Sequence, residues 1–287
     1  MSRIDEALSR QGKSRDESRP PGAAEADVFM SPWRSGLPVD HPAPHRGSGP
    51  HPRIVSSESL ARLGSERRAR LTLFTDVEPV MAHQFRRLAA ILMKAQGQER
   101  LKSVLITSAS PHDGKTLTSL NLAGVLSKSY GLRVLLVEAD LRRPGIAAAL
   151  DLRPREGLSA ALKAGEDRKV PLIELSDTLT LLPAGRPDLD PLSGLTSPRM
   201  KRILDDATEE FDWVILDTPP LGAAADAGLL CPLVDAAILV IRARQTACAA
   251  VQAAVETLGR ERIIGVVLNG VDQAPSAAYD GGYGYAV

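Results

Sequence analysis

The segment Val104–Thr116 (VLITSASPHDGKT) joins an apolar strand to a helix through a short loop of small and polar residues. Successive backbone N–H groups of such a loop, backed by the first turn of a helix, form a concave site for anionic oxygens. The pattern therefore predicts a phosphate-binding loop, in which Lys115 contacts the β- and γ-phosphates of a nucleotide and the Thr116 hydroxyl binds Mg²⁺. The residues expected to contact the nucleotide here are Ser110, Pro111, His112, Asp113, Gly114, Lys115, Thr116 and Leu117.

One position of this loop departs from the usual phosphate-loop pattern. That pattern begins with a glycine five residues before the Gly-Lys pair, and this chain has Ala109 there. Gly114 is present, and it is needed because a side chain would keep the backbone from approaching the phosphates. Taken alone, the motif leaves an ordinary strand-to-helix turn open as an alternative.

Acidic residues end two further apolar runs. The run Val134–Pro144 (VLLVEADLRRP) carries Glu138 and Asp140, and the run Trp213–Pro220 (WVILDTPP) carries Asp217. Ligands bind at the carboxyl ends of buried parallel strands, so these carboxylates are expected beside the phosphate loop. Mg²⁺ prefers oxygen ligands and keeps several waters, which makes the two aspartates candidate metal ligands together with the loop threonine. The alternative is that these acids cap the loops or helices that follow them.

Helices and strands are expected to alternate along the rest of the chain. An amphipathic helix is predicted at Glu78–Lys94, and further helices are predicted from Ser197 to about Asp205 and over residues 246–258. Apolar runs predict strands within LTLLPAG (residues 179–185) and at residues 236–242 and 263–269. Such alternation predicts an α/β fold with a doubly wound, mainly parallel sheet.

The order of these motifs, the phrases LVEADLRRP and DTPP, and VVLNGVD near the end of the chain resemble the bacterial tyrosine kinases of capsule and exopolysaccharide biosynthesis. These kinases are relatives of the MinD and ParA ATPases, and the resemblance spans roughly Thr72 to Asp272. It implies a cytoplasmic, MgATP-dependent autokinase that phosphorylates tyrosines in its own C-terminal segment. The opening MSRIDEALSR also resembles the start of the soluble autokinases of exosortase-associated exopolysaccharide loci.

The resemblance also implies roles for single residues. Lys115, Asp140 and Asp217 would carry catalysis, Asp226 matches a family aspartate near the metal, and Asn269 would contact the adenine. From the residues alone, Asn269 could equally be a turn residue before a glycine. The family has an aspartate where this chain has Glu138, a longer side chain of the same charge. The glutamate is therefore expected either to serve as the proton acceptor or to leave a weak kinase.

Members of this family usually work with a membrane-embedded polysaccharide co-polymerase, so such a partner is implied. A homo-oligomer is also expected, although the usual contact is altered. The family helix carries a Glu-x-x-Arg-x-x-Arg pattern, and His83, Arg86 and Ala89 occupy its three places here. Only the middle position matches, which puts ring-like assembly through this helix in doubt.

Three of the four tyrosines, Tyr279, Tyr283 and Tyr285, lie within the last nine residues. A tail rich in Gly and Ala cannot bury aromatic rings, so these phenols are expected to be exposed on a flexible segment. They are the predicted phosphate acceptors. The alternative is a docking strand or an aggregation-prone tail.

The chain is expected to divide into four parts: a short helix at residues 1–10, a disordered tether at 11–70, the phosphate-loop kinase domain at 71–273, and the flexible tail at 274–287. Lys+Arg and Asp+Glu are equal at 35 each, which gives no drive toward nucleic acid. No apolar run is long enough for a transmembrane segment or a signal peptide. The two cysteines, Cys231 and Cys248, are expected to be buried. These features predict a cytoplasmic protein, recruited to the inner face of the membrane by its partner.

Two other functions stay open at this stage. One is an ATP-driven switch like MinD or ParA. That subgroup has a signature lysine early in the loop, and Ser110 occupies that position here, which argues against this function. The other is a non-catalytic, ATP-binding adaptor of the co-polymerase, which the Glu138 substitution and the altered helix pattern keep plausible.

Overall fold

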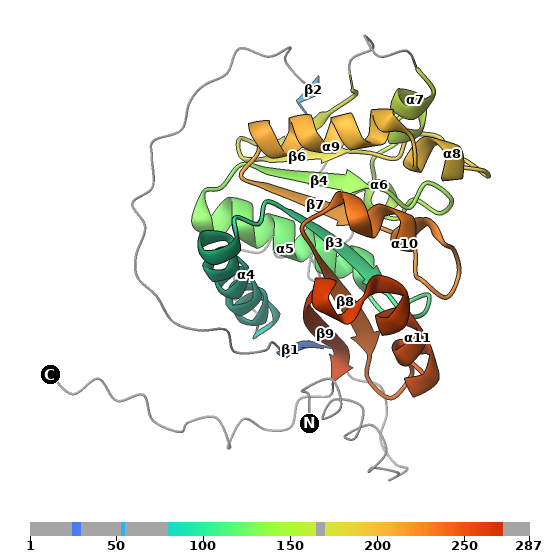
Figure 1. Cartoon of the computed structure of the whole chain (residues 1–287). Helices are drawn as coiled ribbons and strands as arrows, with labels where there is room; N and C mark the ends of the chain where they lie inside the picture. The colour runs from blue at the N-terminus through green and yellow to red at the C-terminus, as the bar shows by residue number, and fades with distance from the viewer. Residues whose placement is uncertain (1–24, 30–52, 55–79, 165–169, 272–287) are drawn as a thin grey trace, which may run out of the picture.

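The computed structural model describes residues 25–29, 53–54, 80–164 and 170–271 of the 287-residue chain. A nine-stranded sheet with the order β1-β9-β8-β3-β7-β4-β6-β5-β2 forms its centre (Figure 1). The strands are β1 (Glu25–Phe29), β2 (Arg53–Ile54), β3 (Ser103–Ser108), β4 (Val134–Glu138), β5 (Ile173–Ser176), β6 (Leu179–Leu182), β7 (Trp213–Asp217), β8 (Ala236–Arg242) and β9 (Ile263–Val271).

Most neighbouring strands run parallel. β3 pairs in parallel with β7 and β8, β4 with β6 and β7, and β8 with β9. The antiparallel pairs lie toward the edges, where β1 meets β9 and β5 meets β6. This arrangement confirms the predicted α/β fold with a mainly parallel sheet.

Helices cover both faces of the sheet. They are α4 (Val80–Glu99), α5 (Lys115–Tyr130), α6 (Ile146–Ala149), α7 (Leu158–Lys163), α8 (Leu192–Leu195), α9 (Pro198–Glu210), α10 (Asp226–Leu230) and α11 (Cys248–Leu258). Figure 1 shows α4 and α5 on one face, and α9, α10 and α11 on the other.

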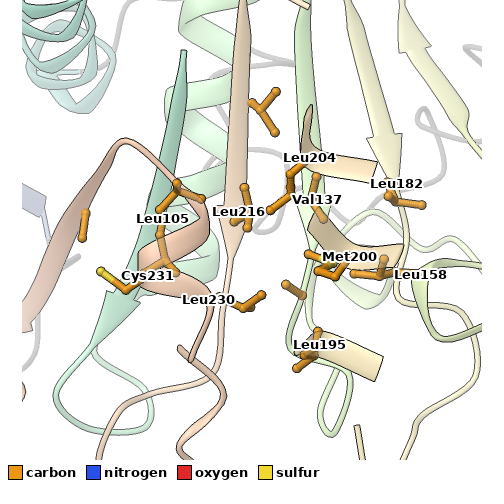
Figure 2. Close-up of a cluster of buried hydrophobic side chains, with 14 of the residues drawn as sticks. Leu105, Val137, Leu158, Leu182, Leu195, Met200, Leu204, Leu216, Leu230 and Cys231 are labelled. Atoms are coloured by element: carbon orange, nitrogen blue, oxygen red, sulfur yellow. The ribbon is translucent and has the colours of Figure 1, made fainter. Parts of the chain in front are cut away.

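The two-layer core follows from the alternation of side chains along each strand. In β3, Val104 and Ile106 pack in the cluster that contains α4 and α5 residues, whereas Leu105 packs in the cluster on the opposite face. Figure 2 shows this second cluster, where Leu105 and Leu216 of the sheet lie near Leu230 of α10. Because both faces are covered, β3, β4 and β7 are buried along their whole length.

The sheet order sets the geometry of the site. β3 lies between β7 and β8, and β4 lies on the far side of β7. In this register Ile106 of β3 pairs with Asp217, and Glu138 of β4 pairs with the same aspartate. The predicted acidic residues therefore meet at one edge of the sheet, next to the loop that follows β3.

Several predicted bounds need correction. Helix α4 continues one turn beyond the expected Lys94, to Glu99, and α9 continues to Glu210 rather than ending near Asp205. Ser197 caps α9 as predicted, because its side chain accepts a hydrogen bond from the Met200 amide. Strand β5 and the short helices α6, α7, α8 and α10 were not predicted.

The cysteine prediction is half right. Cys231 is buried in the core cluster shown in Figure 2, whereas Cys248 is exposed at the start of α11. Residue 248 is the first position of an amphipathic helix whose buried face is formed by Val251, Ala254 and Leu258. Its apolar character therefore does not place it in the core.

Two short strands fall inside the segment that was predicted to be a structureless tether. β1 and β2 lie at the two ends of the sheet order, so at these residues the structure differs from that prediction. The predicted helix at residues 1–10 and the tyrosine tail at 274–287 lie outside the described residues, and the division into four parts stays a prediction. Among the described helices, none has the length and apolar character that crossing a bilayer requires.

Candidate active site

The phosphate-binding loop connects β3 to α5, and its backbone has the geometry of a cradle. Gly114, directly before the helix, has φ of 104°, and His112 has φ of 67°. A Cβ atom added to Gly114 would lie 2.0 Å from the side-chain amide nitrogen of Asn269. Both the backbone conformation and the close approach therefore require glycine at this position.

Lys115 and Thr116 begin α5, and each contacts one of the predicted aspartates. Lys115 Nζ lies 3.1 Å from Asp140 Oδ2, and Thr116 Oγ1 donates a hydrogen bond of 2.8 Å to Asp217 Oδ2. The structure thus brings together four of the predicted site residues. An ammonium group, a hydroxyl and two carboxylates in this arrangement suit the phosphates of a nucleotide and a hard divalent cation.

Ser119, one turn further along α5, contributes a contact that the sequence did not predict. Its hydroxyl lies 3.1 Å from Asp217 Oδ1, so both oxygens of this carboxylate have hydroxyl partners on α5. The spacing of four residues from Lys115 was the available signal, because residues four apart share a helix face.

The electrostatics of Asp217 reflect its complete burial. Burial raises the pKa of this carboxyl to about 6, and the charge of Lys115 and the hydroxyls of Thr116 and Ser119 oppose the shift. A nearby cation would favour the ionised form, so this pocket is suited to receiving further positive charge.

Asp113 braces the loop from inside. It is 2% exposed, and its carboxylate accepts hydrogen bonds from the Ser110 amide at 2.9 Å and from the Thr246 hydroxyl at 2.7 Å. Burial raises the pKa of Asp113, against the effect of these two bonds. The side chain of Asp113 therefore supports the loop from inside, and the predicted contact of this residue with a nucleotide stays a prediction. Thr246, at the start of the segment that leads into α11, was missed because its partner is distant in sequence.

Asn269 lies on β9 and contacts the loop as well. Its side-chain amide nitrogen donates to the Asp113 carbonyl at 2.8 Å, and its side-chain oxygen accepts from the Gly270 amide at 2.9 Å. The structure thus places Asn269 against the phosphate loop. The predicted contact with adenine is a separate matter and stays a prediction.

Glu138 lies at the end of β4, but its surroundings differ from those of the two aspartates. The side chain is 0% exposed, and it accepts hydrogen bonds from the amides of Ile146 (2.6 Å), Ala147 (3.2 Å) and Ala184 (3.0 Å). Burial raises its pKa, and the three amides oppose that shift. A proton acceptor must reach its substrate, and this carboxylate is enclosed by backbone.

Asp226 and Arg142 form an ion pair beside the site. Arg142 Nε lies 3.1 Å from Asp226 Oδ2, and Arg142 Nη1 donates to the carbonyl of Leu189 at 2.6 Å. Asp226 is fully buried, and its other carboxylate oxygen has no hydrogen-bond partner in the described structure. Asp226 thus lies beside Arg142, two residues after Asp140 in the chain. Its family role near the metal stays a prediction.

The predicted contacts of the remaining loop residues with a nucleotide stay predictions. Ser110, Pro111 and His112 precede Asp113 in the loop, with Pro111 and His112 exposed, and Leu117 packs against the core on the α5 side. In α4, Arg86 is half-buried, and Ala89 is fully buried in the core. Ala89, at the last position of that pattern, is therefore a core residue of this helix.

These features define a class of protein. The model of the CobQ/CobB/MinD/ParA nucleotide binding domain matches residues 104–280, which include the loop, all three acidic strand ends and Asn269. The chain thus carries a nucleotide-binding domain of this class.

The relatives narrow the class further. Tyrosine-protein kinase YwqD of Bacillus subtilis is 33% identical over 224 residues, which cover 77% of this chain and 94% of YwqD. The kinase domain of the Escherichia coli tyrosine kinase ETK is 29% identical, with a TM-score of 0.63 over 71% of this chain and 80% of that domain. The chain belongs to the bacterial tyrosine-kinase family of capsule and exopolysaccharide systems.

One relative is much longer than this chain. The succinoglycan biosynthesis transport protein ExoP of Rhizobium meliloti is 31% identical over 201 residues, which are 67% of this chain but 25% of ExoP. The similarity therefore covers only one part of that transport protein.

Proposed function

We propose that this protein is an ATP-dependent protein-tyrosine autokinase that phosphorylates Tyr279, Tyr283 and Tyr285 of its own C-terminal segment. The observation that carries the proposal is the contact of Lys115 with Asp140 and of Thr116 with Asp217 at one edge of the sheet. Relatives that are named tyrosine-protein kinases and align over this site support it.

The residues present fit MgATP. Gly114 gives the loop a backbone conformation that other residues rarely adopt, and Lys115 at the helix start supplies a positive charge. Thr116, Asp140 and Asp217 provide oxygen ligands of the kind that Mg²⁺ prefers. When bound, this cation would neutralise charge on the phosphates. Asn269, by the family resemblance, would contact the adenine.

Phosphoryl transfer requires positioning and charge neutralisation more than covalent chemistry by the protein. The tyrosine oxygen forms a bond to the γ-phosphorus, the bond from that phosphorus to the β-phosphate oxygen breaks, and ADP leaves. A tyrosine hydroxyl has a pKa near 10, so a carboxylate that takes its proton assists the step. Asp140 is one of the strand-end carboxylates of this site, and it also pairs with Lys115.

The proposed setting is exopolysaccharide or capsule synthesis or export. The chain aligns with a part of ExoP, which is named a succinoglycan biosynthesis transport protein. This alignment supports a membrane polysaccharide co-polymerase as the partner. The protein would then act at the cytoplasmic face of the membrane, as a homo-oligomer. The N-terminal sequence MSRIDEALSR supports the soluble, exosortase-associated subtype.

Labelled ATP tests the proposal directly. Wild-type protein is expected to gain label on its tyrosines, and Lys115→Met is expected to abolish that label because the phosphates lose their cation. Lys128→Met, an exposed position on the same helix, is the matched control and should label normally. Equal phosphotyrosine in the wild type and in Lys115→Met would reject the assignment.

A second candidate function has one observation in its favour. Glu138, which was expected to serve as the proton acceptor, is enclosed by backbone, and a non-catalytic, ATP-binding adaptor would permit this. The same experiment separates the functions: labelled tail tyrosines indicate a kinase, released phosphate indicates a MinD-like switch, and bound nucleotide with neither product indicates the adaptor.

A further inference from the structure

We propose that Glu138 is a positioning residue, whose carboxylate fixes the loop at residues 139–145 against the phosphate-binding helix so that Asp140 and Thr116 lie correctly for magnesium nucleotide. The inference rests on the proposed function for its meaning in catalysis. Its structural basis is independent of that function.

The hydrogen-bond partners of Glu138 are of one kind. Three backbone amides donate to its carboxylate, two from the start of α6 and one from Ala184 after β6. Backbone amides buried without an acceptor are costly. The carboxylate satisfies three of them and thereby links β4, α6 and the end of β6.

These hydrogen bonds close the loop at residues 139–145. Glu138 precedes residue 139, and Ile146 follows residue 145, so the hydrogen bond of 2.6 Å between them ties the two ends of the loop together. Within the loop, the amides of Ala139 and Asp140 both donate to the Asp217 carbonyl, at 2.8 and 3.1 Å. Asp140 is therefore held by its own amide, which bonds to β7, and by the Glu138 bond that closes the loop.

The same loop lies against Thr116, the proposed metal ligand. A Cβ added to Gly145 would lie 3.3 Å from Thr116 Cγ2, so the loop passes directly against that residue. Asp140 approaches Lys115 near the beginning of the loop, and Gly145 approaches Thr116 at its end. A change in the shape of the loop would displace contacts to both residues.

The length of the glutamate side chain suits these bonds. The carboxylate spans from the end of β4 to amides of two separate segments, α6 and the β6 end. Aspartate is shorter by one methylene and cannot reach the same amides without movement of the backbone. The glutamate at this position is thus accounted for by a structural task.

The test uses Glu138→Gln and Glu138→Asp in the full-length protein, with Glu256→Gln and Glu256→Asp on the exposed face of α11 as matched controls. Glutamine places an N–H group against a donor amide, and aspartate loses reach. Both variants are expected to melt roughly 5 °C lower without ligand. Both should also weaken the Mg²⁺-dependent part of ADP affinity by about tenfold in calorimetry, while affinity without Mg²⁺ stays the same.

Two results would overturn the proposal. Loss of phosphorylation by about a hundredfold or more, with melting and Mg²⁺ dependence unchanged, would make Glu138 the proton acceptor. Lower melting with unchanged Mg²⁺ dependence would make it a structural residue only. Residual phosphorylation in Glu138→Gln that keeps the acid limb of the wild-type pH profile supports the positioning role. Melting and ADP binding involve no phosphoryl transfer, so a wild type without kinase activity would reject the proposed function and leave this test intact.

Discussion

Glu138 and Asp217 are neighbours in the sheet, and they make an instructive pair. They are register partners at the ends of β4 and β7, both are fully buried, and burial raises the pKa of both. Their hydrogen-bond partners differ completely. Asp217 accepts from the hydroxyls of Thr116 and Ser119, whereas Glu138 accepts only backbone amides in the bonds described.

Two buried acids at the same strand edge can therefore be told apart by the groups that bond to them. Hydroxyl groups rotate and accept as well as donate, so they can give up a carboxylate oxygen to a cation. Backbone amides are fixed by the fold and only donate. Burial and the direction of the pKa shift are therefore the same for these two acids, and only their hydrogen-bond partners distinguish them.

The largest effect is expected for Asp217→Asn. We expect phosphorylation to fall on the order of a thousandfold, as when a preorganised electrostatic group is removed, while stability without ligand is retained because the amide can bond to both hydroxyls. Asp205→Asn, in an exposed ion pair on α9, is the control. Kinetics with labelled ATP and melting curves measure the two effects, and a large loss of stability would make Asp217 structural as well.

Glu138→Ala should give the converse result. Three buried amides lose their acceptor, so the free energy of unfolding is expected to fall by about 3 kcal/mol. Urea denaturation monitored by circular dichroism measures this, and Glu256→Ala on the exposed face of α11 should change stability by less than about 0.5 kcal/mol. Unchanged stability would contradict the structural role of Glu138.

The pH dependence of stability tests whether the pKa of Asp217 is raised. Its folded pKa of about 6 lies above the unfolded value of about 4. The neutral acid is thus favoured in the folded state, and this stabilisation is complete below about pH 4 and lost as the pH rises through 6. Relative to Asp217→Asn, Mg²⁺-free wild type should lose up to about 3 kcal/mol over this range. A constant difference between the two proteins would show that the pKa is not raised.

The smallest expected effect is that of Ser119→Ala. The variant removes one of the two hydroxyl partners of Asp217, which should raise the aspartate pKa further and cost about 1 kcal/mol of stability. Ser129→Ala, at an exposed position near the end of α5, is the matched control. Differential melting of the two variants measures the effect, and equal melting would mean that Ser119 contributes nothing to holding Asp217.

Much of the frame was accessible from sequence, because buried parallel strands have continuous apolar runs that end in functional side chains. Lys115, Thr116, Asp140 and Asp217 were placed by that logic, and the structure brings them together. Strand β5 and the short helices were missed, since four to six residues carry no clear period.

The partners of Glu138 could not be predicted for a different reason. Every residue except proline has a backbone amide, so an acceptor of amides leaves no pattern in the sequence. The bond between Thr246 and Asp113 was equally hidden, because it joins residues separated by 133 positions. Such contacts are set by how the chain packs, and they appear only when the fold is known.

The position of Asn269 has a consequence for biosynthesis. Its hydrogen bond to the Asp113 carbonyl joins positions 156 residues apart, and β9 pairs with β8 beside the strand that feeds the phosphate loop. A ribosome must therefore add nearly all of the catalytic domain before the last contact of this loop can form. A nascent chain that stops short of β9 has every residue of the Val104–Thr116 motif and still lacks the finished cradle.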